Sequence, residues 1–202
     1  MALWLAGEPL VLASRSKARQ AMLAAAGVPT EVWPADLDER RLEAGARSQT
    51  PREIAAHLAR EKALAVAKSK PARLTLGADQ TLALDAACLA KPADRAAARA
   101  QLHALSGRSH ELLSAVAVVQ HGAVLFEHVG VARLAMRVLS DQFIELYLDA
   151  AGSAATASVG AYQIEGLGSQ LFERVDGDYF TVLGLPLMET LDFLRRRGCL
   201  AQ

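Results

Sequence analysis

Residues 9–27, PLVLASRSKARQAMLAAAG, decide the class of fold. The run PLVLAS at residues 9–14 is short and apolar and ends in small polar residues, which predicts a buried strand that stops at a loop. Ser16 has the side chain of a helix N-cap, and the residues that follow it indicate a helix that ends at Gly27. This strand, loop and helix start bring backbone N–H groups, two hydroxyls and Arg19 to one place.

The alternation of strands and helices continues through the first half of the chain. Thr50, Pro51 and Glu53 form the start of a long helix, with a cap, a proline at the first position and a capping-box glutamate. Residues 73–85, RLTLGADQTLALD, indicate two strand segments interrupted at GADQ, where Gly77 marks a bulge or a close approach by another group. The remaining expected elements are a strand at 30–35, a charged loop at 36–49, an extended stretch at 88–92 and a helix at 93–105.

The second half of the chain indicates locally paired strands. Two long strands meet at a His121-Gly122 turn, and a second hairpin is expected at 171–184 around Asp176-Gly177. The other expected elements are a helix at 142–150 capped by Ser140, a glycine-rich loop at 151–169 and a closing helix at 184–198. Alternation followed by hairpins predicts an α/β fold with a mixed sheet, in a single domain over residues 1–202 with no separable linker.

Composition narrows the functional class. The chain has 202 residues, 22 Lys+Arg against 22 Asp+Glu, 52% hydrophobic and 5% aromatic residues. This balance excludes intrinsic disorder and argues against nucleic-acid binding by bulk charge or by aromatic stacking. Cys88 and Cys199 lie far apart and predict free thiols. The apolar start is broken by Gly7, Glu8 and Pro9, which predicts no signal peptide, no membrane anchor and a cytoplasmic location.

Polar residues that interrupt apolar elements are the candidates for chemistry. They are Ser14, Ser16, Arg19, Glu39, Lys62, Asp79, Lys91, Ser106, His110 and Glu165. An arginine, two lysines and several carboxylates suit a metal-bound polyphosphate, because the cations neutralise phosphate oxygens while the carboxylates hold the metal and orient water.

Each candidate also has an ordinary structural interpretation. Asp79 could be a turn residue between two strands. Arg19 and Lys62 could be solvated helix residues, and Ser14 and Ser16 could have no role beyond ending a strand and capping a helix. The five histidines show no spacing typical of zinc ligands. From the residues alone, the chain is an α/β enzyme with a phosphate-handling cleft.

Seven segments in order resemble the Maf-like nucleoside triphosphate pyrophosphatases, from Leu10 almost to the C-terminus. They are LVLASRSKAR, DLDER, REKALAVAK, LGADQTLALD, AKP, LHALSGRSHEL and GAYQIEGLGSQLFERVDGDYFTVLGLPL. The resemblance implies an elongated mixed sheet, two lobes around a deep nucleotide-binding cleft, and often a homodimer. It implies hydrolysis of a nucleoside triphosphate to the monophosphate and pyrophosphate with a divalent cation, Mg²⁺ or Mn²⁺.

The resemblance also implies a role for individual residues. Asp79, in the Gly-Ala-Asp segment, would be the proton acceptor, and Glu39 and Asp79 would hold the metal. The residues that would bind phosphate are Ser14, Ser16, Arg19, Lys62 and Lys91.

The sequence departs from the family pattern at two places. Lys17-Ala18 replaces the usual Pro-Arg after the Ser-x-Ser loop, and Ala90 replaces the glycine before Lys-Pro. Ala18, Gln80 and Glu165 occupy the positions associated with base selectivity. The branch acting on dTTP and UTP typically has Arg, Thr and Gln there, and the branch acting on 7-methyl-GTP has Trp, Gln and Glu.

Three functional interpretations follow from the resemblance. The first is a cytoplasmic pyrophosphatase that removes modified or non-standard nucleotides, and the second is a dedicated 7-methyl-GTP pyrophosphatase. The third, of another class, is a non-enzymatic nucleotide-binding regulator of septum formation. Retention of Arg19, Lys62, Asp79 and Lys91 favours an enzyme.

Overall fold

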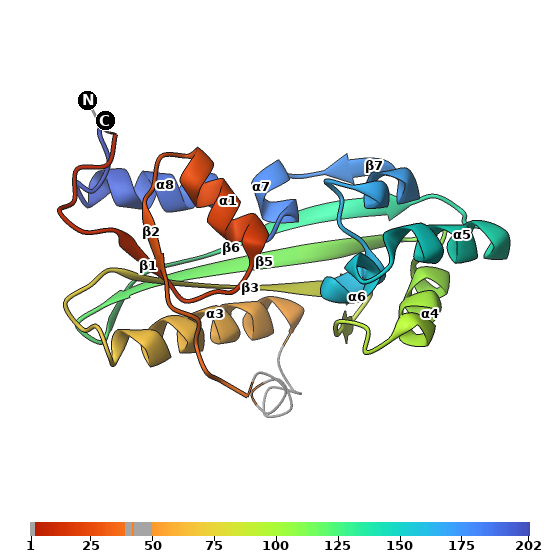
Figure 1. Ribbon diagram of the computed structural model, residues 1–202, viewed down its shortest axis with the longest axis horizontal. Helices are drawn as coiled ribbons and strands as arrows, with labels where there is room; N and C mark the ends of the chain where they lie inside the picture. Colours follow the sequence, from red (N-terminus) through yellow and green to blue (C-terminus); the bar gives the residue numbers. More distant parts are fainter. Residues whose placement is uncertain (1–2, 39–41, 43–49) are drawn as a thin grey trace. The chain divides into compact units, whose positions relative to one another are not determined.

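The strand β1 (Leu10–Leu12) lies near one edge of a seven-stranded mixed sheet (Figure 1). It is parallel to β2 (Thr30–Val32) on one side and to β3 (Thr75–Leu84) on the other. The strand order is β2-β1-β3-β5-β6-β7, and β4 (Ala87–Leu89) pairs with β3 in the antiparallel direction. The α/β class and the mixed sheet are therefore confirmed.

The computed structural model describes residues 3–38, 42 and 50–202. The other strands are β5 (Ser109–Gln120), β6 (Ala123–Met136) and β7 (Phe172–Asp176). The α-helices are α1 (Lys17–Ala25), α3 (Pro51–Ala67), α4 (Arg95–Leu105), α5 (Asp141–Ala151), α6 (Ala154–Ala157), α7 (Tyr179–Val182) and α8 (Leu187–Arg196). Two short 3₁₀ helices are η1 (Val159–Ala161) and η2 (Leu167–Leu171). No helix in these ranges is both long and apolar enough to cross a membrane.

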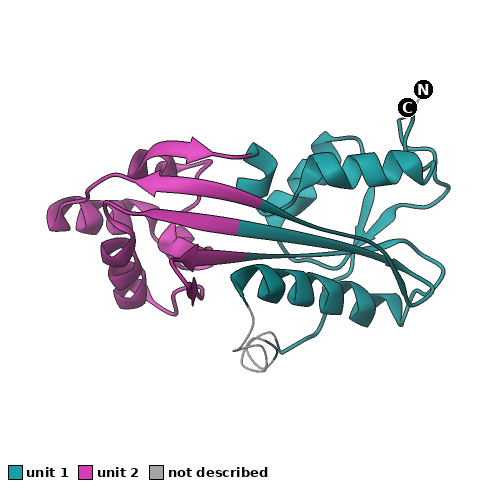
Figure 2. Cartoon of the chain, turned by 180° about the vertical axis from the view of Figure 1, so that it is seen from behind, with its two compact units in different colours: residues 1–80, 113–130, 178–202 teal, residues 81–112, 131–177 magenta. Residues whose placement is uncertain are grey.

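The chain divides into two compact units, and neither is continuous in sequence (Figure 2). Unit 1 contains residues 1–80, 113–130 and 178–202, whereas unit 2 contains residues 81–112 and 131–177. The strands β3, β5 and β6 contribute residues to both units.

Unit 1 has helices on both faces of its part of the sheet (Figure 1). Alternation along β1 separates the two faces: Leu10 and Leu12 pack with residues of α1 and α8, whereas Val11 packs with Val66 of α3. Two-sided burial explains why this strand is a continuous apolar run.

The helix α3 lies unusually close to the sheet because small residues line its inner side. Ala55, Ala59 and Ala63 are fully buried and pack against Ala115 and Ala117 of β5. A Cβ added at Gly77 of β3 would lie 2.2 Å from the Ala59 carbonyl oxygen and 2.6 Å from the Ala63 nitrogen. The close approach expected at Gly77 is confirmed, but the expected interruption is wrong, since β3 is one strand of 10 residues.

Replacing Gly77 with alanine should destabilise the protein, because α3 must move away from β3 to admit the methyl group. Overpacking of this kind costs about 1–3 kcal/mol of unfolding free energy, which urea titration measures. Gly7→Ala is the matched control, because nothing lies within 4 Å of a Cβ at that position. Equal stability of the two variants would contradict the close-approach explanation.

The predicted helix starts are confirmed by their capping contacts. The Arg19 N–H donates to Ser16 Oγ at 3.4 Å, and the Phe143 N–H donates to Ser140 Oγ at 3.1 Å. Thr50 and Glu53 form the reciprocal capping box of α3. His121 and Gly122 both have positive φ values, 51° and 74°, as a two-residue hairpin turn requires.

The hairpin expected at 171–184 is wrong in its second half. β7 pairs with β6 in the antiparallel direction, and the residues after Gly177 form the helix α7. The reason is Asp178, whose carboxylate accepts from the Thr181 N–H at 2.7 Å and caps the new helix. The glycine-rich loop at 151–169 also differs from its prediction, since it contains α6, η1 and part of η2.

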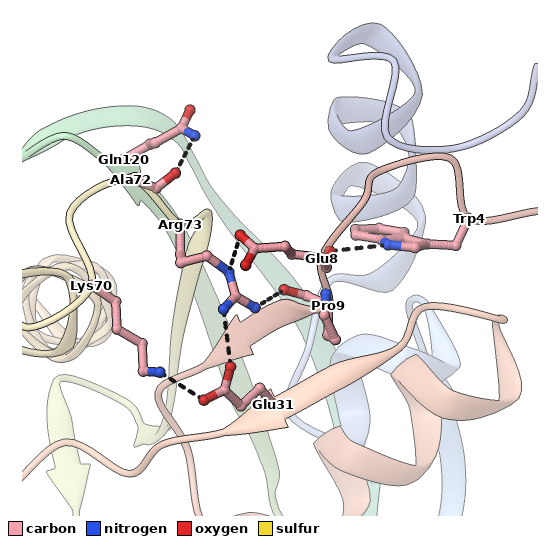
Figure 3. A network of polar contacts seen from close by, with 8 residues as sticks. All are labelled: Trp4, Glu8, Pro9, Glu31, Lys70, Ala72, Arg73 and Gln120. Carbon is pink, nitrogen blue, oxygen red and sulfur yellow. Dashed lines mark hydrogen bonds and ion pairs between the residues drawn. The ribbon is translucent and has the colours of Figure 1, made fainter.

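A polar network fixes the start of β1 in unit 1 (Figure 3). The Arg73 guanidinium donates to the Pro9 carbonyl at 2.6 Å and pairs with Glu8 and Glu31 at 3.0 and 3.1 Å. A hydrogen bond from Lys70, together with the positive charges of Lys70 and Arg73, lowers the pKa of Glu31. The network anchors the end of β1 opposite to the Ser-x-Ser loop.

His110 of β5 is a buried titratable side chain of unit 2, with 2% of its surface exposed. Its Nε2 atom lies 2.7 Å from the Tyr162 hydroxyl, and its ring lies against Phe172. Within the described residues its Nδ1 atom has no hydrogen-bond partner. Burial lowers the pKa of His110 to about 4, so the ring is neutral at pH 7.

This neutral histidine should make the protein less stable as the pH falls from about 6.5 to about 4. In that window the unfolded chain takes up a proton that folded His110 refuses, so stability is complete above the window and is lost below it. The shift corresponds to about 3 kcal/mol. Urea titrations across this range should show a shallower pH dependence for His110→Gln, by one proton. Identical slopes for the two proteins would contradict the assignment.

Candidate active site

The loop after β1 begins alongside β3 and carries Ser14 and Ser16. The Ala13 N–H donates to the Leu76 carbonyl at 2.8 Å, which keeps the loop against that strand. Ser14 is buried, Ser16 is half-buried, and the Ser16 N–H donates to Ser14 Oγ at 3.3 Å.

Arg19 of α1 is buried, so its interpretation as a solvated helix residue is wrong. Its Nη1 donates to Ser14 Oγ at 3.1 Å and to the Ala78 carbonyl at 3.0 Å. Its Nε donates to the Gly184 carbonyl at 2.7 Å. A single guanidinium therefore joins the loop after β1, the strand β3 and the segment before α8.

Lys62 and Asp79 form a buried ion pair on the other side of β3. Lys62 Nζ lies 2.6 Å from Asp79 Oδ1, and the two residues are 7% and 9% exposed. Asp79 lies inside β3, so its interpretation as a turn residue is wrong, and Lys62 is not a solvated helix residue. The alanine-lined approach of α3 brings the two side chains together, since a larger residue at Ala59 or Ala63 would hold the helix away.

Gln80 has a fixed amide orientation. Its Nε2 donates to Ser114 Oγ at 3.0 Å and to the carbonyls of Thr181 and Val182 at 3.2 and 3.0 Å. Ser114 Oγ also donates to the Thr181 carbonyl at 2.7 Å. With three acceptors around the nitrogen, Oε1 is the atom of Gln80 that can accept a further hydrogen bond.

Sequence reasoning missed the residues that orient Arg19 and Gln80. Ser114 is a lone hydroxyl in an apolar strand, which is a usable signal, but its partners lie 34 and 67 residues away. Gly184 has a φ of 100° and contributes only its backbone carbonyl to Arg19. A backbone acceptor has no side-chain signature in a sequence.

The predicted residues fall into both units of the chain. Those in unit 1 are Ser14, Ser16, Ala18, Arg19, Lys62, Asp79 and Gln80. Lys91 and Glu165 belong to unit 2, and both are exposed. Glu39 lies outside the described residues.

Two cations therefore bind adjacent residues of β3 in unit 1, Arg19 at the Ala78 carbonyl and Lys62 at the Asp79 carboxylate. Arg19 belongs to α1 and Lys62 to α3. Serine hydroxyls and a guanidinium suit the oxygens of a phosphate, and a carboxylate can accept a proton from water. Within residues 3–38, 42 and 50–202, no group of three or more His, Cys, Asp or Glu side chains is placed to hold a metal ion.

Comparison with known proteins settles the family. A family model described as Maf-like protein matches residues 9–197. The chain belongs to the Maf-like family. Among its relatives, a "Nucleoside triphosphate pyrophosphatase" of Rhodopseudomonas palustris (strain ATCC BAA-98 / CGA009) is 57% identical over 201 residues, covering 100% of both chains.

Two further relatives of this Maf-like protein have names that differ in the substrate they give. A "Nucleoside triphosphate pyrophosphatase" of Bradyrhizobium diazoefficiens is 53% identical over 201 residues, covering 100% of both chains. A "7-methyl-GTP pyrophosphatase" of Mesorhizobium japonicum is 50% identical over 195 residues, covering 96% of this chain and 98% of that protein.

Proposed function

We propose that this protein is a nucleoside triphosphate pyrophosphatase, which hydrolyses a nucleoside triphosphate to the monophosphate and pyrophosphate. Full-length relatives with that name support the activity. The structural observation that carries it is the buried Lys62–Asp79 pair, next along β3 to Ala78, whose carbonyl accepts from the same Arg19 guanidinium that donates to Ser14 Oγ. A carboxylate held in this way serves chemistry on a phosphate, whereas phosphate binding alone would need only the donors.

The proposed reaction is attack of water on the α-phosphorus. The water oxygen forms a bond to that phosphorus, the bond to the bridging oxygen breaks, and pyrophosphate leaves. Asp79 accepts the proton of the attacking water, and Lys62 fixes the carboxylate in place. Ser14, Ser16 and Arg19 bind phosphate oxygens, and Arg19 opposes the negative charge that grows on the leaving group. Lys91 is proposed to bind phosphate as well.

A divalent cation, Mg²⁺ or Mn²⁺, completes the proposal. Magnesium in phosphate-handling sites is usually held by one or two carboxylates together with the phosphates of the substrate. The single carboxylate of Asp79 fits a cation that arrives with the triphosphate. Asp79 and Glu39 would hold the cation, which would supply neutralisation of the phosphate charge.

Release of pyrophosphate from a panel of nucleotides, with Mg²⁺ and with Mn²⁺, tests the proposed activity. Turnover of at least one nucleotide is expected, and modified or non-standard bases belong in the panel. Binding of nucleotide without any turnover would support the regulator of septum formation instead. The homodimer, the cleft between two lobes and the cytoplasmic location stay predictions.

The base that we propose is a guanine, on account of Glu165 and Gln80. Guanine presents N1–H and an exocyclic amino group side by side, and a carboxylate accepts both. Gln80 has its NH₂ group bound within the protein, so its free function is also an acceptor. A donor-rich base edge suits a carboxylate such as that of Glu165 better than the mixed edge of uracil or thymine does.

Glu165→Gln should shift activity from guanine nucleotides toward UTP or dTTP. A mismatched polar group costs ~1–3 kcal/mol, which corresponds to about tenfold or more in the ratio of kcat/KM values. Glu173→Gln, another exposed glutamate of unit 2, is the matched control and should leave the ratio unchanged. A wild-type enzyme that prefers UTP or dTTP to every guanine nucleotide would overturn the assignment, whatever the variant does.

A second candidate function is the dedicated 7-methyl-GTP pyrophosphatase, favoured by the relative of that name. Methylation at N7 gives the guanine ring a positive charge, which an aromatic partner would stabilise. Ala18 cannot stack on a base, so we expect a weaker preference for the methylated base than in relatives with an aromatic residue there.

A further inference from the structure

The segment that leads to Glu165 begins with a strained turn in unit 2. Gly160 and Ala161 have φ values of 79° and 63°, two successive residues in the left-handed region. This conformation costs an alanine roughly 1–2 kcal/mol and persists only where the surroundings impose it. A Cβ at Gly160 would lie 2.6 Å from the Tyr162 ring and 2.7 Å from Leu82, so only glycine fits there.

Three side chains from three different elements impose this turn. The Gly160 N–H donates to Gln101 Oε1 of α4 at 3.1 Å, and the Tyr147 hydroxyl of α5 donates to the Ala161 carbonyl at 3.0 Å. The third contact is between the Tyr162 hydroxyl and His110 Nε2 of β5. Each of three consecutive residues is therefore held by a separate element of unit 2.

A buried aromatic residue and a second turn connect this strained turn to Glu165. Tyr162 is 4% exposed, and its ring lies edge-on to Phe172 with centroids 4.8 Å apart. The next residues form a tight turn, in which the Gly166 N–H donates to the Gln163 carbonyl at 3.2 Å. Glu165 lies inside this second turn, three residues after the buried Tyr162.

Gln101 has a second contact at the other end of its amide. Its Nε2 donates to the Ala90 carbonyl at 2.6 Å, and Ala90 is the residue before Lys91. One side chain therefore spans the segment that carries Lys91 and the turn that leads to Glu165. The amide orientation is determined chemically, because Oε1 meets an N–H group and Nε2 meets a carbonyl.

We propose that Gln101 is a positioning residue that holds the Lys91 segment with one end of its amide and the Glu165 segment with the other, and thereby contributes to phosphate binding through the first contact and to base selection through the second. The inference rests on the proposed function, in which Lys91 binds phosphate and Glu165 reads the base. Gln101 touches neither nucleotide nor reacting atoms. It acts through two backbone groups, the Ala90 carbonyl and the Gly160 N–H.

The two halves of the amide can be tested separately by two substitutions. Gln101→Met has a similar shape and loses both hydrogen bonds. Gln101→Glu keeps an acceptor for the Gly160 N–H but presents a second oxygen to the Ala90 carbonyl, so only the Lys91 segment is released. Gln120→Met is the matched control, because Gln120 also bridges chain segments, but in unit 1. Its Nε2 donates to the Ala72 carbonyl (Figure 3), and its Oε1 accepts from Arg197.

The measurement is kcat and KM for a guanine and a uracil nucleotide in each variant. Gln101→Met should lower the guanine-to-uracil ratio of kcat/KM by about fivefold to tenfold, the equivalent of one hydrogen bond. Gln101→Glu should keep the ratio while KM rises for both nucleotides. Gln120→Met should change neither quantity. Hydrogen exchange should show faster exchange of the Gly160 amide in Gln101→Met and not in Gln101→Glu.

Tyr147→Phe supplies an independent arm, since it removes only the hydroxyl that holds the Ala161 carbonyl. It should lower the ratio in the same direction, which keeps the proposal testable even where Gln101→Met does not fold. A wild type that shows base preference, with an unchanged ratio in these two variants, overturns the inference alone. A wild type that releases no pyrophosphate from any nucleotide overturns the proposed function and this inference with it.

Discussion

Asp79→Asn is expected to fold normally and to lose turnover by ~10²–10⁴-fold, the usual contribution of a general base. The side chain keeps its shape, and its carbonyl oxygen can still accept from Lys62 Nζ, which lies 2.6 Å from Asp79 Oδ1 in the native protein. What is lost is an anionic oxygen that can take a proton from water. Pyrophosphate release under saturating nucleotide measures the effect on kcat.

Asp85→Asn is the control for this prediction. Asp85 directly follows β3, is exposed, and pairs with Arg108 rather than with Lys62. The variant should keep the wild-type rate. A rate above a tenth of the wild type in Asp79→Asn would show that Asp79 is not the proton acceptor and that the buried ion pair is structural.

Lys62→Met should have the largest effect on stability. The substitution removes the ammonium that faces Asp79, and leaving one partner of a buried pair alone typically costs about 3–5 kcal/mol. Urea unfolding at neutral pH measures the loss. Loss of turnover should accompany it, since the proposed site loses a cation and the partner that fixes its carboxylate.

A surface ion pair on the same helix provides the comparison for Lys62→Met. Arg60 pairs with Glu127, and both side chains are partly exposed, at 43% and 33%. Arg60→Met should cost less than about 1 kcal/mol. The double variant Lys62→Met/Asp79→Asn should be less destabilised than the sum of the single variants. Additive effects would contradict a direct Lys62–Asp79 interaction.

The sequence predicted most of the fold because its signals are local. The cap at Ser16, the capping box at Thr50 and the two-residue turn at His121-Gly122 each depend on residues within four positions of one another. The hairpin at 171–184 failed for the same reason, because two local signals competed there. Asp176-Gly177 indicated a turn between strands, but the cap supplied by Asp178 started a helix instead.

The sequence predicted which residues form the candidate site but not which of them contact one another. Ser14, Arg19, Lys62 and Asp79 stood out as polar side chains in or beside apolar elements. That Lys62 meets Asp79, 17 residues away, depends on how closely α3 packs against β3. That Arg19 meets Gly184, 165 residues away, depends on a backbone carbonyl, which no pattern of side chains reveals.

Because unit 1 is discontinuous in sequence, the residues of the candidate site are synthesised well before the carbonyl groups that orient two of them. Arg19 and Gln80 leave the ribosome early, but the carbonyls that orient them belong to Thr181, Val182 and Gly184. A nascent chain that stops before residue 178 therefore contains every proposed phosphate-binding and base-reading residue without the acceptors that align two of them. Because the last segment of unit 1 also supplies core residues such as Phe193 and Leu194, an incomplete chain should remain inactive until synthesis has ended.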